Sequence, residues 1–141
     1  MTAEVIDKFC RIYKTLGKGN LNQLGLIYSD DINFIDGLHN LQGLNQLSDY
    51  FVHLYENLLF CHFSIEDVIP GEGQASIVWV MHYAHPKINK GKPIFVNGCS
   101  HLKFNEKIYY HRDFLDMGQM LYEHLPLLGG VIRTIKKRVA S

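Results

Sequence analysis

The chain has 141 residues, of which 47% are hydrophobic, and its 14 basic side chains balance its 14 acidic ones. This length suits one ordinary domain with a proper core, and this apolar content argues against disorder. A net charge of zero leaves no global field to attract nucleic acid, and no apolar run is long enough to span a membrane. The charged start, MTAEVIDKF, does not resemble a signal peptide.

The cysteines and histidines point away from a metal centre. Cys10, Cys61 and Cys99 are scattered and form no CxxC pair, which is typical of reduced thiols in a cytoplasm. His82 and His85 are three apart on a predicted strand and so point to opposite faces, and no HExxH motif is present. We therefore expect a cytoplasmic protein with no metal and no cofactor.

The first half of the chain predicts three helices and one short strand. Residues 3–16 place apolar side chains at helical spacing, and two glycines follow. A second short helix is predicted over 21–28, a turn over 29–31, a strand over 32–36 that alternates apolar and polar residues, and a third helix over 44–59.

The second half changes character and predicts strands. Alternating or β-branched segments cover 61–69, 75–85, 94–104 and 108–115, with turn-forming residues between them. Helices first and an antiparallel meander afterwards predict an α+β fold in which helices pack on one face of a curved antiparallel sheet.

The tail departs from the strand pattern. Residues 117–125 are helix-like, Pro126 and two glycines interrupt them, and 131–139 form a basic amphipathic helix. That helix suits three interpretations: ordinary packing with a solvated basic face, a lid over a pocket mouth, or contact with a membrane surface or nucleic acid. We expect a single domain over 1–141, with 117–141 as a C-terminal helical extension.

The stretch IYYHRDFLD, residues 108–116, organises the rest of the chain. Both of its faces carry aromatic and charged residues, which indicates a strand covered on both sides by a polar cavity and a partner surface. One face holds Tyr109, His111, Asp113 and Leu115, and the other holds Tyr110, Arg112, Phe114 and Asp116.

The face that holds Phe114 predicts an assembly. Tyr110 and Arg112 share it, with His101 and either Trp79 or Val80 beside them on the convex side of the sheet. Such an aromatic patch favours burial against another surface, so we expect a two-fold homodimer through this sheet face.

The order of elements and two motifs resemble the nuclear transport factor 2-like superfamily and, within it, the SnoaL-like branch. Asp30-Asp31-x-x-x-x-Asp36 is similar to that family's "aDDa…eDp" segment, and RDFLD at 112–116 is similar to its terminal "wRDyfD" strand. The likeness covers residues 3–118. It implies a cone-shaped fold whose bent sheet wraps the helices around a deep apolar pocket, as in ketosteroid isomerases, limonene epoxide hydrolases and polyketide cyclases.

This resemblance places two carboxylates in catalytic positions. Asp36 falls where the isomerase keeps its general base, and Asp113 where the hydrolase keeps a water-activating carboxylate. The remaining positions depart, so neither catalytic set is complete. For the isomerase, the tyrosine falls at Ile12, one residue from Tyr13, and the oxyanion aspartate falls at Ser100. For the hydrolase, the arginine and aspartate fall near Met81 and His82. Its tyrosine and asparagine fall at Phe34 and Asp36.

The candidate catalytic residues are Asp113, Asp36 and His111. Burial in an apolar cleft and a second carboxylate nearby both favour a protonated acid, so two aspartates can supply an acid and a base. Asp36 could instead close the turn before Gly37, and His111 could be a satisfied core histidine rather than a partner of Asp113. The candidate ligand-binding residues are Phe34, Tyr13, His82, Ser100 and Leu115, and the sequence leaves open which face His82 occupies.

Three functions remain open from the sequence. The first is an acid–base enzyme of the isomerase, cyclase or hydrolase type that acts on an apolar small molecule. The second is a non-catalytic binding module for such a ligand, and the third is a structural dimer with a vestigial pocket. Two carboxylates that face an enclosed cavity favour the enzyme, whereas one carboxylate neutralised by an arginine favours the others.

Overall fold

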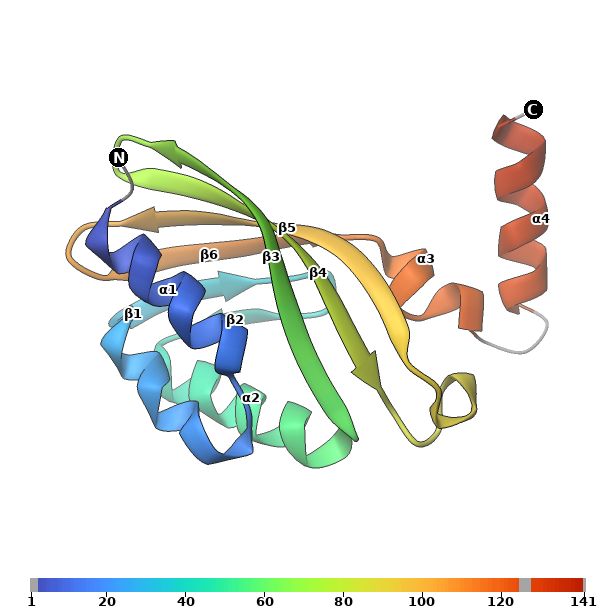
Figure 1. The fold of residues 1–141 in the computed structure, drawn as a ribbon, viewed down its shortest axis with the longest axis horizontal. Helices are drawn as coiled ribbons and strands as arrows, with labels where there is room; N and C mark the ends of the chain where they lie inside the picture. Colours follow the sequence, from blue (N-terminus) through green and yellow to red (C-terminus); the bar gives the residue numbers. More distant parts are fainter. Residues whose placement is uncertain (1–2, 125–127, 141) are drawn as a thin grey trace.

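The computed structural model describes residues 3–124 and 128–140, and in this part of the chain six strands form one sheet of order β2-β1-β6-β5-β4-β3. The sheet curves around the helices α1 and α2 (Figure 1). The elements in chain order are α1 (Glu4–Thr15), the 3-10 helix η1 (Lys18–Leu26), β1 (Tyr28–Ile35), β2 (Asn40–Gln42), α2 (Leu44–Asn57), β3 (Phe60–Gly71), β4 (Gln74–Ala84), η2 (Asn89–Gly91), β5 (Ile94–Phe104), β6 (Ile108–Leu115), α3 (Met117–Met120), η3 (Tyr122–His124) and α4 (Leu128–Ala140).

The α+β fold predicted from the sequence is confirmed, with one correction to the sheet. Strands β3 to β6 form the expected antiparallel meander, and β5 and β6 have the predicted bounds. β1, however, pairs with β6 in parallel, with Phe34 opposite His111, so the sheet is mixed rather than wholly antiparallel. Side-chain alternation is the same in both arrangements, so a strand's own residues do not disclose the direction of its neighbour.

β1 begins earlier than the sequence predicts. The chain is already extended at Tyr28, which is fully buried and pairs with Ile108, so residues 29–31 are strand and not a turn. The register of β1 against β6 shifts between Tyr28 and Asn33, as at a β-bulge. The bulge is polar and has the composition of a turn, which explains the wrong prediction. The segment before it, predicted as a helix over 21–28, is the 3-10 helix η1.

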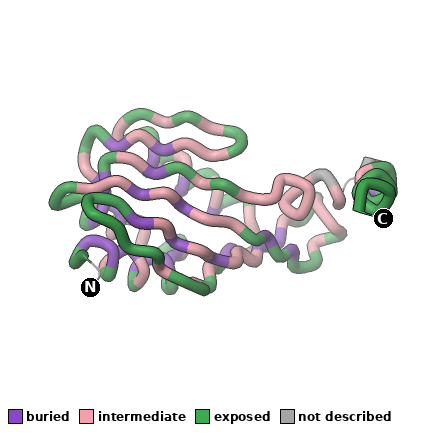
Figure 2. Tube along the Cα trace, turned by 90° about the horizontal axis from the view of Figure 1, so that it is seen from above, coloured by how far each residue is buried: buried purple, intermediate pink, exposed green. Residues whose placement is uncertain are grey.

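The core lies between the concave face of the sheet and the two helices. Buried and exposed positions alternate along the strands, as Figure 2 shows, because successive side chains point to opposite faces. Burial of each large apolar side chain contributes roughly 1.5–3 kcal/mol to the free energy of folding. The helices bury Val5, Ile6, Phe9, Ile12 and Tyr13 from α1 and Leu47, Phe51 and Tyr55 from α2.

The C-terminal helix α4 stands apart from the sheet (Figures 1 and 2). It contacts η3, where Arg133 donates to the carbonyl of Glu123 and Lys136 lies 3.4 Å from the Glu123 carboxylate. The apolar residues Val131, Ile135 and Val139 are 54%, 54% and 81% exposed, so α4 does not dock on the body of the protein as a lid would. Leu125 and Pro126, where the helix-like segment was predicted to end, lie outside the described residues.

Among the described residues, every helix is too short or too polar to cross a membrane.

Candidate active site

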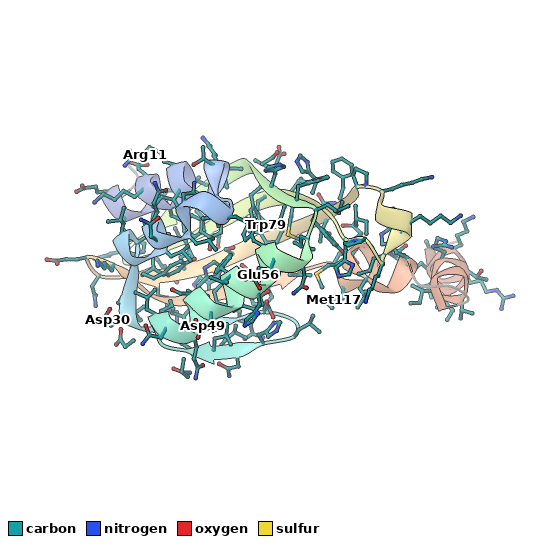
Figure 3. All side chains as sticks on the ribbon, turned by 90° about the horizontal axis from the view of Figure 1, so that it is seen from below. Arg11, Asp30, Asp49, Glu56, Trp79 and Met117 are labelled. Carbon is teal, nitrogen blue, oxygen red and sulfur yellow. The ribbon has the colours of Figure 1, made fainter. Side chains whose placement is uncertain are left out.

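A cavity of about 340 Å³ lies between the concave face of the sheet and the helices. All four strands of the meander contribute lining residues, and Met117 and Met120 of α3 line it as well. Trp79, which lines the cavity, lies near the middle of the fold in Figure 3, whereas the charged side chains of Arg11 and Asp30 lie at its edge. The walls are mainly aromatic and aliphatic, and include Phe9, Tyr13, Phe34, Tyr50, Phe51, Leu54, Phe63, Trp79, Met81, Tyr83 and Leu115; the polar lining residues are Asp36, His39, Ser100, His111 and Asp113.

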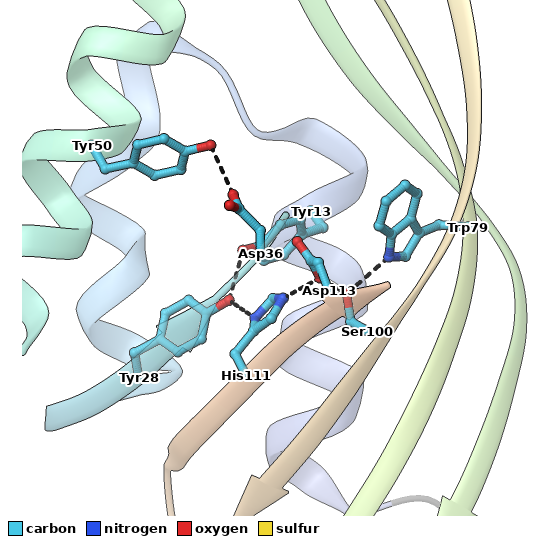
Figure 4. A network of polar contacts seen from close by, with 8 residues as sticks. All are labelled: Tyr13, Tyr28, Asp36, Tyr50, Trp79, Ser100, His111 and Asp113. Atoms are coloured by element: carbon cyan, nitrogen blue, oxygen red, sulfur yellow. Dashed lines mark hydrogen bonds and ion pairs between the residues drawn. The ribbon is translucent and has the colours of Figure 1, made fainter. Parts of the chain in front are cut away.

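Asp113 is held by one of its two carboxylate oxygens. Oδ1 accepts a hydrogen bond from Ser100 Oγ at 2.5 Å and lies 2.6 Å from His111 Nε2 (Figure 4). Trp79 Nε1 donates to Ser100 Oγ at 2.8 Å, which fixes the orientation of that hydroxyl. Within the described chain, Oδ2 of Asp113 has no hydrogen-bond partner. One oxygen is therefore anchored, and the other is free to meet a ligand.

A buried chain of hydrogen bonds continues behind His111. Its Nδ1 lies 2.7 Å from the hydroxyl of Tyr28, which lies 2.6 Å from the hydroxyl of Tyr13. A carboxylate only accepts, so Nε2 of a neutral His111 donates to Asp113 and Nδ1 accepts from Tyr28, which in turn accepts from Tyr13. This order satisfies every group and fixes the tautomer of the imidazole.

Burial keeps the two phenols of this chain neutral. Desolvation raises the pKa of Tyr13 and Tyr28 well above the ordinary value, and the negative charge of Asp113 adds to the rise at both. The tyrosines therefore act as hydrogen-bond donors and acceptors and do not compete with Asp113 as bases at neutral pH.

Asp36 also lines the cavity, but both of its oxygens are engaged. Oδ1 accepts from the backbone N–H groups of Leu38 and His39 at 2.8 and 2.7 Å, and His39 Nδ1 lies 3.1 Å away. Oδ2 accepts from the hydroxyl of Tyr50 at 3.2 Å. Asp36 thus shapes the turn that leads to β2, as the turn-closing interpretation of the sequence holds, and it also places a carboxylate at the cavity.

Comparison with known proteins agrees with the fold of this chain. The model of the SnoaL-like domain matches residues 9–111. The chain belongs to the SnoaL-like domain family. No curated protein matches it.

Solved structures share the fold of this SnoaL-like protein at low sequence identity. A protein of ketosteroid isomerase-like fold from Catenulispora acidiphila, in complex with trimethylamine, is 17% identical, with a TM-score of 0.72 over 84% of this chain and 90% of that one. A candidate SnoaL-like polyketide cyclase from Shewanella putrefaciens is 17% identical, with a TM-score of 0.71 over 85% and 95%. A protein of nuclear transport factor 2-like fold from Burkholderia pseudomallei is 9% identical, with a TM-score of 0.74 over 84% and 95%.

Most residues that the sequence singles out do meet at this cavity of the SnoaL-like fold. Asp36, Asp113 and His111 line it, as do Tyr13, Phe34, Ser100 and Leu115. Arg112 turns away and stacks on Phe114, with its guanidinium carbon 4.8 Å from the centre of the phenylalanine ring. Asp113 is therefore not neutralised by its neighbour in sequence.

His82 is the exception among the predicted ligand-binding residues. The cavity face of β4 is taken by Trp79, Met81 and Tyr83, and alternation therefore sends His82 to the other side of the sheet. There its ring packs against His62, at a centroid distance of 5.3 Å, and against Phe95. A role for His82 in lining the pocket is thus not supported.

Tyr109 also departs from the predicted alternation. It is exposed, whereas Ile108 before it is buried, and a register shift between β5 and β6 lies at this end of the ladder. The shared face that the alternation predicts for β6 therefore holds from His111 to Leu115 only.

Three residues of the site were missed from the sequence. Trp79 is one of two residues considered for the convex face, Tyr28 is the last residue of the helix predicted over 21–28, and Tyr50 falls within the helix predicted over 44–59. The structure explains the position of Trp79. It stands directly opposite Gly98 in the β4–β5 register, and a Cβ on Gly98 would lie 2.2 Å from its indole, so glycine leaves room for the ring.

In the described part of the chain, no three histidine, cysteine or acidic side chains are grouped so that they could hold a metal ion.

Proposed function

We propose that this SnoaL-like protein is an acid–base enzyme that moves a proton on a small, largely apolar molecule, with Asp113 as the group that takes and returns the proton. The observation that carries the proposal is the asymmetry of the Asp113 carboxylate. Ser100 and His111 hold Oδ1, while Oδ2 faces an apolar cavity without a partner in the described chain.

The arrangement suits proton abstraction for three reasons. Two donors fix the direction of the carboxylate, so no side-chain freedom has to be lost at the moment of reaction. The apolar walls keep water away from the free oxygen and strengthen its interaction with a proton. A proton taken by Oδ2 can be returned at another atom of the same molecule, which is the core of an isomerisation or a cyclisation.

His111 and Asp36 have supporting roles in this proposal. His111 is only 1% exposed, with both ring nitrogens engaged, so it orients and stabilises Asp113 and does not touch the ligand's reacting atoms through a free nitrogen. Asp36 with the hydroxyl of Tyr50 forms a second polar point of the cavity. Among the described residues, no arginine or lysine lines the cavity, which is the arrangement that favours the enzyme over the alternatives.

The test uses 5-nitrobenzisoxazole, a flat neutral molecule. Removal of its C3 proton by a base breaks the ring N–O bond and gives 2-cyano-4-nitrophenolate, which is coloured. We expect saturable acceleration by the protein of at least about 100-fold over the same buffer, as positioned bases give. Binding of the probe without any acceleration would show a binding module instead.

The binding module is the second candidate, and one observation favours it. Both oxygens of Asp36 are occupied by protein donors. An acid and a base that both act on the ligand need one free carboxylate oxygen each, and only Asp113 has one.

We further propose that the protein works as a homodimer in the cytoplasm. The convex face of the sheet exposes large side chains, with Phe95 and Phe114 61% and 51% exposed and Arg112 stacked on Phe114. The cysteines Cys10, Cys61 and Cys99 are all unpaired, which suits a reducing compartment.

A further inference from the structure

In the described part of the chain, histidines are the only lining groups that can balance the acidic side chains of the cavity. Its lining holds two carboxylic side chains, Asp36 and Asp113, and in the described residues no lysine or arginine. The imidazoles of His39 and His111 are the lining groups that could become positive. His111 satisfies all its hydrogen bonds as a neutral ring, because Nδ1 accepts from Tyr28 while Nε2 donates to Asp113. The charge of Asp113 is therefore left for the ligand to balance.

The walls around these carboxylates are the kind that bind cations. The face of an aromatic ring is negative and attracts an ammonium group, most strongly at tryptophan and tyrosine. Trp79 and Phe63 meet edge to face, with centroids 5.4 Å apart, and Tyr13 meets Phe63 in the same way at 5.4 Å. Phe34 and Tyr50 form a second pair with centroids 6.0 Å apart. All five rings line the cavity.

The phenols of Tyr13 and Tyr50 can meet a cation with their ring faces and not with a phenolate charge. Burial raises the pKa of Tyr13 and of Tyr50 well above the ordinary value, with the Asp36 carboxylate adding to the rise at Tyr50. What these two residues offer a cation is the face of a neutral aromatic ring, and the hydroxyl of Tyr50 is already used on Asp36.

We propose that the natural ligand of this cavity is an organic cation: a hydrophobic amine in its ammonium form, or a quaternary ammonium compound. This inference rests on the proposed function, since it names the class of molecule on which Asp113 acts. The ammonium group lies among the aromatic rings and is balanced by the two carboxylates.

Other ligand classes fit the cavity less well. An anionic ligand would face two carboxylates and no lysine or arginine of the described lining. A neutral ligand would bury the free oxygen of Asp113 without balancing its charge.

The test compares three probes that share a benzyl group and a tetrahedral head. Benzyltrimethylammonium is a permanent cation, 2,2-dimethylpropylbenzene is its neutral carbon isostere, and benzylsulfonate is an anion. Calorimetry or competition with a dye gives the Kd of each for the full chain and for the variants Asp36→Asn and Asp113→Asn. The measured quantity is the ratio of the Kd of the neutral probe to the Kd of the cation.

We expect the cation to bind and the sulfonate not to bind. Each asparagine variant should lower the neutral-to-cation ratio about tenfold, because it removes one charge from a poorly solvated site. The Kd of the neutral probe should not rise, since the shape of the cavity is unchanged and the neutral probe no longer buries that charge. A retained Kd for the neutral probe also shows that a variant is folded.

The proposal is overturned if the sulfonate binds as well as the cation, or if the ratio is the same in the variants as in the original chain. Each failure is separate from that of the proposed function. A chain that binds the cation but does not open 5-nitrobenzisoxazole is an amine-binding protein, and a chain that opens the probe but shows no charge preference is an enzyme for another class.

Discussion

Ser100 and Asp113 face each other directly across β5 and β6, and the serine hydroxyl donates to the carboxylate at 2.5 Å. The same hydroxyl accepts from the indole of Trp79. Ser100 is almost fully buried, so it links a wall of the cavity to the group that we propose as the base. Its position follows from strand register alone, since register partners on adjacent antiparallel strands point to the same face.

The first prediction concerns Ser100→Ala. This change leaves Trp79 Nε1 as a buried donor without an acceptor and removes one of the two donors to Asp113 Oδ1. We expect a loss of about 1–3 kcal/mol in the free energy of unfolding, measured with urea. Ser64→Ala on the exposed side of β3 is the control and should change that free energy by less than about 0.5 kcal/mol. Equal effects of the two variants would show that the Trp79–Ser100–Asp113 contacts add nothing to stability.

The second prediction concerns Gly98→Ala. A Cβ at this position would lie 2.2 Å from the ring of Trp79, so the indole must move out of its place in the cavity. We expect a loss of about 1–3 kcal/mol in stability. The emission of Trp79, the only tryptophan of the chain, should shift at the same time.

Gly19→Ala serves as the control for this change. Nothing lies within 4 Å of the position where its Cβ would be, so stability and emission should both be preserved. An unshifted emission in Gly98→Ala would mean that the glycine does not position the indole.

The third prediction concerns alkaline pH. Desolvation raises the pKa of Tyr13, Tyr28 and Tyr50 above the ordinary value, which is about 10. Above pH about 10 the unfolded chain releases protons that the folded chain keeps, so the stabilising contribution is complete below that pH and is lost as the pH rises beyond it. Urea unfolding at several pH values should show this decline.

The tyrosine absorbance offers a check on the same prediction. The phenolate bands of the buried tyrosines should appear together with the loss of the folded far-ultraviolet signal. Phenolate formation by all three in a chain that is still folded would refute the burial-based account. The variant Tyr28→Phe has one such group fewer and should show a shallower decline.

The fourth prediction concerns the convex face of the sheet. If Phe95 and Phe114 lie in a dimer interface, replacing both with serine should convert the dimer into a monomer in light scattering at micromolar concentration. Leu26→Ser is the control, because Leu26 is 59% exposed but lies on η1. A monomer already in the unmodified chain would remove the dimer from the account.

Alternation along β6 was enough to predict much of the site. It separates Asp113 and His111 from Arg112, and the structure shows Arg112 on the opposite face, stacked on Phe114. The same rule did not fix the face of β4, because both of its faces carry large side chains, with Trp79 and Met81 on one and His82 on the other. Only the pairing of Trp79 with Gly98 decides between them, and pairing is a property of two strands.

The tyrosine chain behind His111 was beyond prediction for a different reason. Tyr28 reaches His111 because β1 carries a bulge and runs parallel to β6. Neither the bulge nor the direction leaves a mark in the sequence near Tyr28, where Ser29, Asp30 and Asp31 have the composition of a turn. Likewise, Tyr50 has the spacing of an ordinary core residue of α2, and its hydrogen bond to Asp36 follows from packing.

The most direct test of the central claim is the rate of 5-nitrobenzisoxazole opening per folded molecule in Asp113→Asn. The asparagine oxygen can still accept from Ser100 and His111, so the fold should persist, and loss of a poorly solvated charge favours stability. We predict a rate at least about 100-fold below that of the unmodified chain, with the free energy of unfolding unchanged or higher. An Asp113→Asn protein that is strongly destabilised yet keeps its full rate per folded molecule would make Asp113 a structural acceptor and contradict the account.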